Sequence, residues 1–150
     1  MIKPVDTIPE SPTQAGKTNR QKIRDDIQEA IDKGIAAFEF VGDYNFKYLG
    51  QYAREEADRM NRNMFSQFIR DHREQYKDRY LPYHDVMKNH DYPIKITTIK
   101  GETKDTRRVF CSLQMDGLEE RFAEIVEAHI RNKEEQDAER ARRRAAYGKG

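Results

Sequence analysis

The stretch of residues 44–80 contains no proline and a single glycine, Gly50. Proline and glycine are the residues that most often interrupt helices, so this stretch favours helical structure and dominates the fold. Two asparagines, Asn61 and Asn63, are good helix N-caps in the middle of the stretch. We therefore predict two consecutive helices, with a break at these asparagines and an end at Pro82.

Residues on the N-terminal side of this stretch predict a helix followed by a short strand. Apolar side chains recur at helical spacing over residues 19–33, with Asn19 as the expected N-cap. Gly34 tolerates left-handed backbone and is the expected helix stop. Residues 35–41 then alternate large apolar residues with smaller or charged ones, as a half-buried strand does.

The C-terminal half of the chain predicts a β-hairpin and a final helix. Residues 83–91 are expected to form a short helical or irregular connector. Residues 92–100 and 107–115 alternate as strands around a charged tip. Asp116 is the expected N-cap of a helix that keeps one face apolar. This face consists of Leu118, Phe122, Ile125, Val126, His129 and Ile130.

The predicted order of elements is helix, strand, two helices, hairpin and helix, which matches a winged-helix arrangement within the α+β class. In that arrangement the third helix faces outward and the hairpin forms the wing. Residues 1–18 carry three prolines and no hydrophobic period, which predicts a flexible, disordered leader. Residues 131–150 predict a charged helical extension, so we expect one winged-helix-like domain over residues 19–130.

The net charge of the chain gives no indication of its partner. There are 28 Lys and Arg residues against 27 Asp and Glu residues, so only a local separation of charge can indicate a nucleic-acid surface. No apolar run approaches the roughly 18 residues of a membrane span. Cys111, the only cysteine, suits a reducing compartment and is expected to be a small core side chain. We expect a cytoplasmic protein with no membrane partner.

No grouping of side chains predicts catalysis. The histidines at positions 72, 84, 90 and 129 do not have the spacing of metal ligands, and the chain lacks CxxC and HExxH. An alternative site at His84, Asp85 and His90 has no further convergent group to support it. The sequence therefore predicts a protein that is not an enzyme and that has no catalytic residues, metal ligands or cofactor.

Basic side chains of residues 62–77 gather on one face of a helical wheel, while the acidic side chains fall elsewhere. Such a ridge can neutralise phosphates and release their counterions, and its central arginines can reach base edges. The alternative is a solvated face whose cations pair with nearby acids. The predicted nucleic-acid-binding residues of this basic ridge are Arg62, Arg70, Arg73 and Lys77.

Two further basic groups are predicted to bind nucleic acid. The hairpin tip of a winged helix approaches the DNA, and an arginine cluster at the C-terminus can contact phosphates or acidic protein surfaces. The alternative for the C-terminal cluster is a soluble helix end whose cations favour the helix dipole. The residues are Lys100, Lys104, Arg107 and Arg108 at the tip, and Arg140, Arg142, Arg143 and Arg144 near the C-terminus.

Four segments of the chain carry a family resemblance: "IKPVDTIPES", "KIRDDIQEAI", "YNFKYLGQYAREEADR" and "YPIKITTIKGETKDTRRVFCSL". Together they resemble small accessory proteins encoded on phages and conjugative elements of Gram-positive gut bacteria. Some of these proteins are anti-CRISPR proteins that bind a Cas nuclease. The resemblance spans roughly residues 1–115 and implies that the partner is a host defence nuclease or the DNA of the mobile element.

Two functional hypotheses follow. In the first, the protein is an anti-CRISPR-type inhibitor that engages a Cas nuclease or its nucleic-acid complex, and its acidic residues contact the positively charged channels of the nuclease. The predicted contacts are Glu55, Glu56, Asp58, Glu134, Glu135 and Asp137.

In the second hypothesis, the protein is a winged-helix accessory or regulatory protein that binds double-stranded DNA. The residues that carry this binding are Arg62, Arg70, Arg73, Lys77, Lys104 and Arg107. The acidic residues at positions 55, 56 and 58 then form structural ion pairs within their own helix. A homodimer through the apolar stripe from Leu118 to Ile130 is compatible with both hypotheses.

Overall fold

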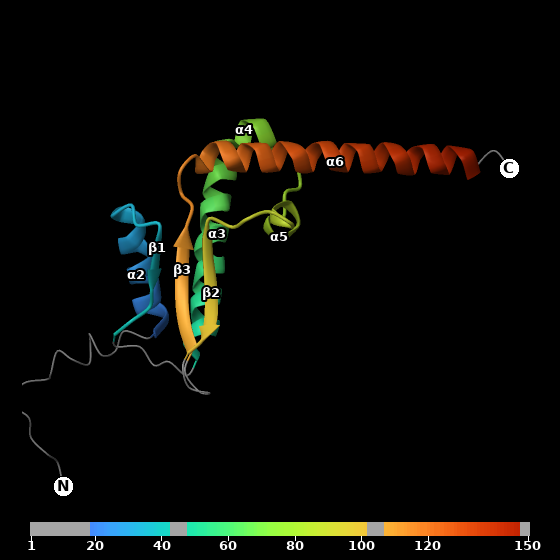
Figure 1. The fold of residues 1–150 in the computed structure, drawn as a ribbon. Coiled ribbons are helices and arrows are strands. Elements are labelled where there is room, and N and C mark those ends of the chain that lie inside the picture. The colour runs from blue at the N-terminus through green and yellow to red at the C-terminus, as the bar shows by residue number, and fades with distance from the viewer. Residues whose placement is uncertain (1–18, 43–47, 102–106, 148–150) are drawn as a thin grey trace, which may run out of the picture. The chain divides into compact units, whose positions relative to one another are not determined.

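The structure is a computed structural model that describes residues 19–42, 48–101 and 107–147. Helices and a three-stranded antiparallel sheet make up the described chain, so the predicted α+β class is confirmed (Figure 1). The predicted leader, residues 1–18, lies outside the described residues. Within the described ranges, no helix combines the length and the apolar character that a membrane-spanning segment needs.

Two compact units make up the chain, and they interleave along the sequence. Unit 1 consists of residues 1–60 and 94–114, and unit 2 consists of residues 61–93 and 115–150. One long helix begins in unit 1 and ends in unit 2, and the hairpin that completes unit 1 is inserted between the two segments of unit 2.

Helix α2 (Asn19–Asp32) opens unit 1 and ends as the sequence predicts. Gly34 has a φ of +69°, and its N–H donates to the Ile31 carbonyl over 3.1 Å. The Ile35 N–H donates to the Ala30 carbonyl over 2.9 Å. These two bonds form the Schellman arrangement, which satisfies carbonyls that the last helical turn leaves open. The predicted glycine stop is therefore confirmed.

The sheet of unit 1 has the strand order β1-β3-β2, and all of its strand pairs are antiparallel. Strand β1 (Ala37–Glu39) pairs with one edge of β3 (Arg107–Leu113), and β2 (Ile94–Lys100) pairs with the other edge. The hairpin register runs from Ile94 opposite Leu113 to Lys100 opposite Arg107. The predicted short strand and hairpin are therefore confirmed.

Helix α3 (Leu49–Asp71) runs without interruption past Asn61 and Asn63, so the predicted break at these residues is wrong. Asn61 is only 3% exposed and lies on the buried side of the helix, where it does not act as a cap. The helix ends after Asp71 instead, because His72 adopts a φ of −117° and a ψ of 27°, which is not helical backbone.

Two short helices follow: α4 (Arg73–Tyr76) and α5 (Tyr83–Met87). The helix predicted for residues 62–80 is thus replaced by the end of α3, one turn of α4 and non-helical residues. A winged helix presents a separate third helix at this place in the chain order. The winged-helix arrangement is therefore not confirmed, although the predicted helical connector is present as α5.

Within unit 1, α3 approaches β2 closely at Gly50. A Cβ atom at this position would lie 3.2 Å from Thr98 Oγ1, closer than most side-chain contacts allow. The guanidinium of Arg54, one turn further along α3, donates a hydrogen bond to the same hydroxyl over 3.0 Å. Glycine at position 50 therefore permits the helix and the strand to share this hydroxyl contact.

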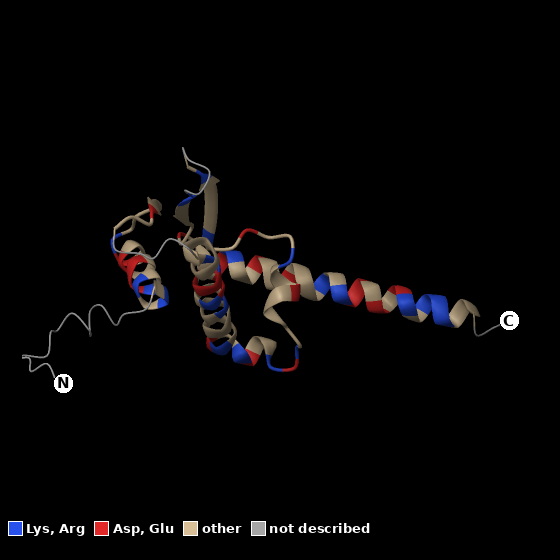
Figure 2. Cartoon of the chain, turned by 90° about the horizontal axis from the view of Figure 1, so that it is seen from below, with Lys and Arg blue, Asp and Glu red and all other residues tan. Residues whose placement is uncertain are grey.

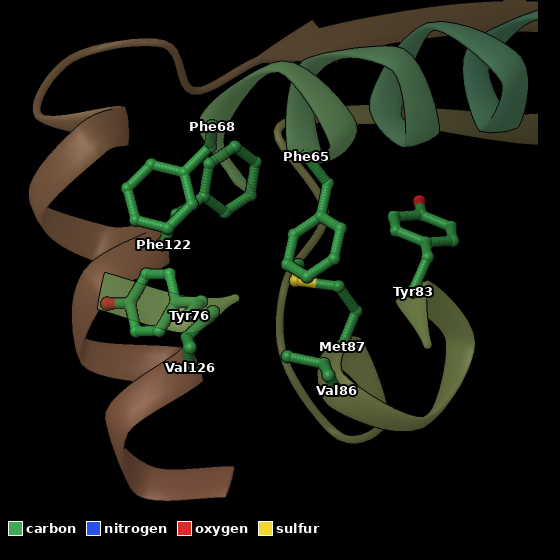
Figure 3. Packing of buried hydrophobic residues seen from close by; sticks show 8 residues of the cluster. All are labelled: Phe65, Phe68, Tyr76, Tyr83, Val86, Met87, Phe122 and Val126. Carbon is green, nitrogen blue, oxygen red and sulfur yellow. The ribbon is translucent and has the colours of Figure 1, made fainter. Parts of the chain in front are cut away.

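An aromatic cluster forms the core of unit 2, where α6 (Leu118–Tyr147) packs against α3, α4 and α5 (Figure 3). The rings of Phe65 and Phe122 meet edge to face with centroids 5.7 Å apart, and Phe68 lies 5.6 Å from Phe122. Phe122 and Val126 are 2% and 0% exposed. The predicted apolar face of the final helix is therefore confirmed.

The start of α6 differs from the prediction by one residue. Gly117, with a φ of +63°, lies between Asp116 and the first helical residue, and its carbonyl accepts a hydrogen bond from the Arg121 N–H over 3.0 Å. Gly117 therefore occupies the N-cap position, and the prediction that Asp116 caps the helix is wrong. Glycine is an accepted N-cap residue, because it reaches the required backbone conformation without steric cost.

Candidate functional site

The predicted basic ridge is divided between α3 and α4. Arg62 and Arg70 belong to α3, whereas Arg73 begins α4 and Lys77 follows it, and all four side chains are exposed. The change of backbone at His72 separates the two pairs. The prediction that these residues form one continuous helical stripe is therefore wrong.

The two arginines of α3, Arg62 and Arg70, contact neighbouring side chains of the same chain. Arg62 Nη2 lies 3.1 Å from His84 Nε2, and its guanidinium is 5.8 Å from the centre of the Tyr83 ring. Arg70 Nη2 donates to Gln67 Oε1 over 2.8 Å. These contacts orient the two guanidinium groups along the surface of unit 2, where they remain open to solvent.

The basic residues of the hairpin have two different environments. Arg108 donates two hydrogen bonds to the Glu39 carboxylate, over 3.0 and 2.7 Å, and lies 5.0 Å from the centre of the Phe110 ring. Arg108 therefore ties β3 to β1, and its guanidinium lowers the pKa of Glu39. Lys100 and Arg107 are exposed and directly opposite each other. The fourth predicted tip residue, Lys104, lies outside the described residues.

A buried carboxylate joins α2 to α3 in unit 1. Glu56 is 0% exposed and lies 3.4 Å from Arg20 Nη1 and 3.1 Å from Arg24 Nε. The Arg24 contact is an ion pair without hydrogen-bond alignment, because neither of its two atoms has a hydrogen-bond partner. Full burial leaves Glu56 no surface with which to contact another molecule.

Glu55 and Asp58 lie beside this buried pair. The Glu55 carboxylate accepts hydrogen bonds from Gln51 and Arg20, and these bonds lower its pKa. Asp58 is half-buried. The predicted pairing within one helix is therefore wrong for Glu56, whose arginine partners come from α2, more than 30 residues away in the sequence. Glu55 forms its ion pair with Arg20 of α2, while Arg59 of its own helix adds a weaker electrostatic attraction.

Polar contacts hold the first half of α6 within unit 2. The Tyr76 hydroxyl donates to Glu127 Oε1 over 3.1 Å, and His72 Nε2 lies 3.2 Å from Glu119 Oε1. Burial, and then the contact with Glu127, raises the pKa of Tyr76. The apolar stripe predicted to pair two copies of the chain packs against the aromatic cluster of unit 2. A dimer through this stripe would therefore compete with the core.

The second half of α6, which we call the charged end (residues 131–147), has no buried side chain. Its first nine residues contain four acidic and two basic side chains, and its last eight contain four arginines and no acidic residue. Figure 2 shows this change of charge along the helix toward the C-terminus. The charged end contains the predicted contact residues Glu134, Glu135, Asp137, Arg140, Arg142, Arg143 and Arg144.

Ion pairs use only part of this charge. Glu134 lies 3.1 Å from Arg79, and Glu139 pairs with Arg142 at 2.9 Å and with Arg143 at 3.2 Å. Arg140 and Arg144 form no ion pair with any residue that the structure describes. These two arginines are four positions apart, so they lie on the same face of the helix.

Histidine, cysteine and carboxylate side chains do not gather as metal ligands in the described part of the chain. The Cys111 thiol is buried in the sheet, and burial raises its pKa to about 12. The thiol therefore stays protonated at neutral pH, as expected for a core side chain.

No protein-family model, curated protein or solved structure matches the chain.

Proposed function

We propose that this protein is a non-catalytic inhibitor that engages a Cas nuclease or its nucleic-acid complex, with the charged end of α6 as its contact surface. The observation that carries the proposal is the exposure of every side chain from Arg131 to Tyr147 in a helix that continues to Tyr147. Helices in folded proteins are stabilised mainly by packing one face. A half-helix that buries no side chain contributes little to folding and is available to a partner.

The order of charges along the charged end supports a nucleoprotein as the partner. Arg140 and Arg144 present two guanidinium groups on one face, and guanidinium groups make strong paired hydrogen bonds to phosphates. Glu135 and Asp137 precede them on exposed positions and can contact basic protein surface. A nuclease bound to its guide and target offers phosphates and positively charged channel walls close together.

The resemblance of residues 1–115 to small accessory proteins of mobile elements supports a Cas nuclease as the particular partner. This resemblance lies outside the charged end, so the two arguments use different residues. Inhibition by occupation of a surface needs no catalytic group in the inhibitor, which agrees with the sequence prediction that the protein has none.

A cleavage assay with a purified, guide-loaded Cas nuclease tests the proposal. We expect the wild-type chain to block target cleavage near a one-to-one ratio. A variant with alanine at positions 140, 142, 143 and 144 should need at least about tenfold more protein for the same block. Alanine keeps the helix propensity of these positions. The matched control, Lys100→Ala with Arg107→Ala, removes exposed charges elsewhere and should inhibit like the wild type.

Unchanged inhibition by the arginine variant would rule out the charged end as the contact surface. Undiminished cleavage with excess wild-type protein, for the Cas nucleases tested, would remove the support for this class of partner.

A second candidate function is binding of double-stranded DNA by a winged-helix accessory or regulatory protein. The observation that favours it is the direct opposition of Lys100 and Arg107 across the hairpin. Like charges in this position destabilise a strand pair, and an anion bound between them would offset the repulsion. A DNA phosphate next to the hairpin would serve this purpose.

Titration of labelled duplex DNA at several salt concentrations distinguishes the two functions. If the hairpin binds DNA, Lys100→Ala with Arg107→Ala should weaken binding and lower the slope of log affinity against log salt by about 2. The arginine variant of the charged end then serves as the control. Absence of binding at low salt would exclude this second function.

A further inference from the structure

A groove of about 360 Å³ lies in unit 2 between α5, with the residues that follow it, and the middle of α6. Its volume falls at the lower end of the range for small-molecule sites, roughly 300–1,000 Å³. Val86, one of the residues that line it, is buried in the aromatic cluster shown in Figure 3. The groove therefore has a fixed apolar wall, because Val86 belongs to the core of the unit.

His129 supplies an unusual polar group to this groove. Its Nε2 atom is buried, and it has no hydrogen-bond partner among the described residues. A buried polar atom without a partner costs free energy, so native proteins pair nearly all of them with protein, water or ligand. His129 also lines the groove, and because its Nε2 atom is enclosed, a rotation of the imidazole ring is needed to bring this atom to a molecule in the groove.

The remaining polar side chains of the groove favour an anion. Lys88 and Lys133 contribute two positive charges, against one carboxylate from Asp85. Three amide side chains add further hydrogen-bond donors, and each can donate through its NH₂ group. These amides belong to Asn89, Asn132 and Gln136.

We propose that this groove binds the phosphate group of a small phosphate monoester, such as a mononucleotide. A phosphate has several acceptor oxygens, which match two ammonium groups and the surrounding amides. The groove is larger than one phosphate needs, so an organic part can be held beside it. Asp85 can accept hydrogen bonds from hydroxyl groups of that part, as a sugar provides. The groove shares Asn132, Lys133 and Gln136 with the start of the charged end, but it does not include the arginines at positions 140–144 on which the inhibition test relies.

Titration of the full-length protein with adenosine monophosphate, followed by NMR of the imidazole and amide resonances, tests the site. We expect saturable shifts that include His129. Lys88→Ala and Lys133→Ala should each weaken binding by about tenfold, the loss expected for one charge-assisted contact. Arg131→Ala removes an equal charge from an exposed position of α6 that does not line the groove. This control should change the affinity by less than about twofold.

Three ligands identify the recognised group and its source. Adenosine, which lacks the phosphate, should give no saturable shift. A short single strand with a terminal phosphate, compared with the same strand without it, tests whether a nucleic-acid end supplies the phosphate. Saturable binding of either phosphorylated ligand, lost without the phosphate, supports the site.

Absence of saturable shifts with both phosphorylated ligands up to about 10 mM, well beyond the millimolar range of weak sites, would overturn the proposal. Equal binding of adenosine and its monophosphate would also overturn it. The same holds if Lys133→Ala binds as tightly as the wild type. None of these outcomes depends on nuclease inhibition, so failure of one proposal leaves the other testable.

Discussion

The two halves of α6 belong to one continuous helix, but the first half packs against the core of unit 2 and the second half is exposed to solvent. Residues 118–130 place Phe122 and Val126 in the aromatic cluster, whereas residues 131–147 leave every side chain exposed. The first half is held by packing, and the second half is held by helix propensity and by ion pairs such as that between Glu139 and Arg143. Helix formation in this chain therefore extends further than folding of the core requires.

The largest effect that separates the two halves is expected for Phe122→Ala. Removal of this ring from the cluster should lower the free energy of unfolding by about 3–5 kcal/mol, because a cavity remains among rings that cannot close it. Urea unfolding followed by circular dichroism measures the change. Glu124→Ala, an exposed change in the same half, should stay within about 0.5 kcal/mol. A loss below about 1 kcal/mol for Phe122→Ala would show that packing in the aromatic cluster does not hold the first half of α6.

An intermediate effect is expected for Tyr76→Phe, which removes the hydroxyl that donates to Glu127 of the packed half. The loss should be about 1 kcal/mol at neutral pH. Because burial and Glu127 raise the folded-state pKa of Tyr76, its contribution is complete below the unfolded pKa of about 10 and falls as pH rises through the folded pKa.

Urea midpoints at pH 7 and above about pH 10 test both parts of this prediction. The difference between wild type and Tyr76→Phe should become smaller at the higher pH. Tyr80→Phe is the matched control, because Tyr80 is 85% exposed. A loss as small as that of the control would mean that the Glu127 contact contributes nothing to stability.

The smallest effect on stability is expected when the chain ends after Gln136. This change removes most of the charged end but keeps the ion pair between Arg79 and Glu134 and all residues that line the groove. The free energy of unfolding should change by less than about 0.5 kcal/mol, because no buried contact is lost. A loss above about 2 kcal/mol would show that the charged end supports the core. Under the proposed function, the same change should abolish inhibition.

Local signals in the sequence predict those elements whose geometry depends on near neighbours. Gly34 stops α2 because the required left-handed backbone is a property of the glycine itself. The hairpin follows from alternation within two adjacent segments, and the buried face of α6 follows from the spacing of Phe122 and Val126. Asn61 shows the limit of such signals, because a residue that can cap a helix is also tolerated inside one when the surrounding turns pack.

The candidate site is harder to predict, because charged residues of the same type have different environments. Glu56 and Glu135 look alike in the sequence, yet Glu56 is fully buried between Arg20 and Arg24 and Glu135 is exposed. Which face of a helix another helix covers depends on contacts between distant segments. The sequence places His129 on the apolar face of its helix. That its Nε2 atom is buried without a hydrogen-bond partner follows only from the packing of α5 against α6.

The sheet order has a consequence for how this protein folds during synthesis. Among the described strands, β1 pairs with β3 alone, so Ala37 has no strand partner until Ser112 has been synthesised. Domains usually fold as they leave the ribosome, starting from the N-terminus. Here the sheet of unit 1 is incomplete until the hairpin has been made, and by then the first segment of unit 2 already exists. Because unit 1 includes residues up to Gln114, its complete fold needs most of the chain to have left the ribosome.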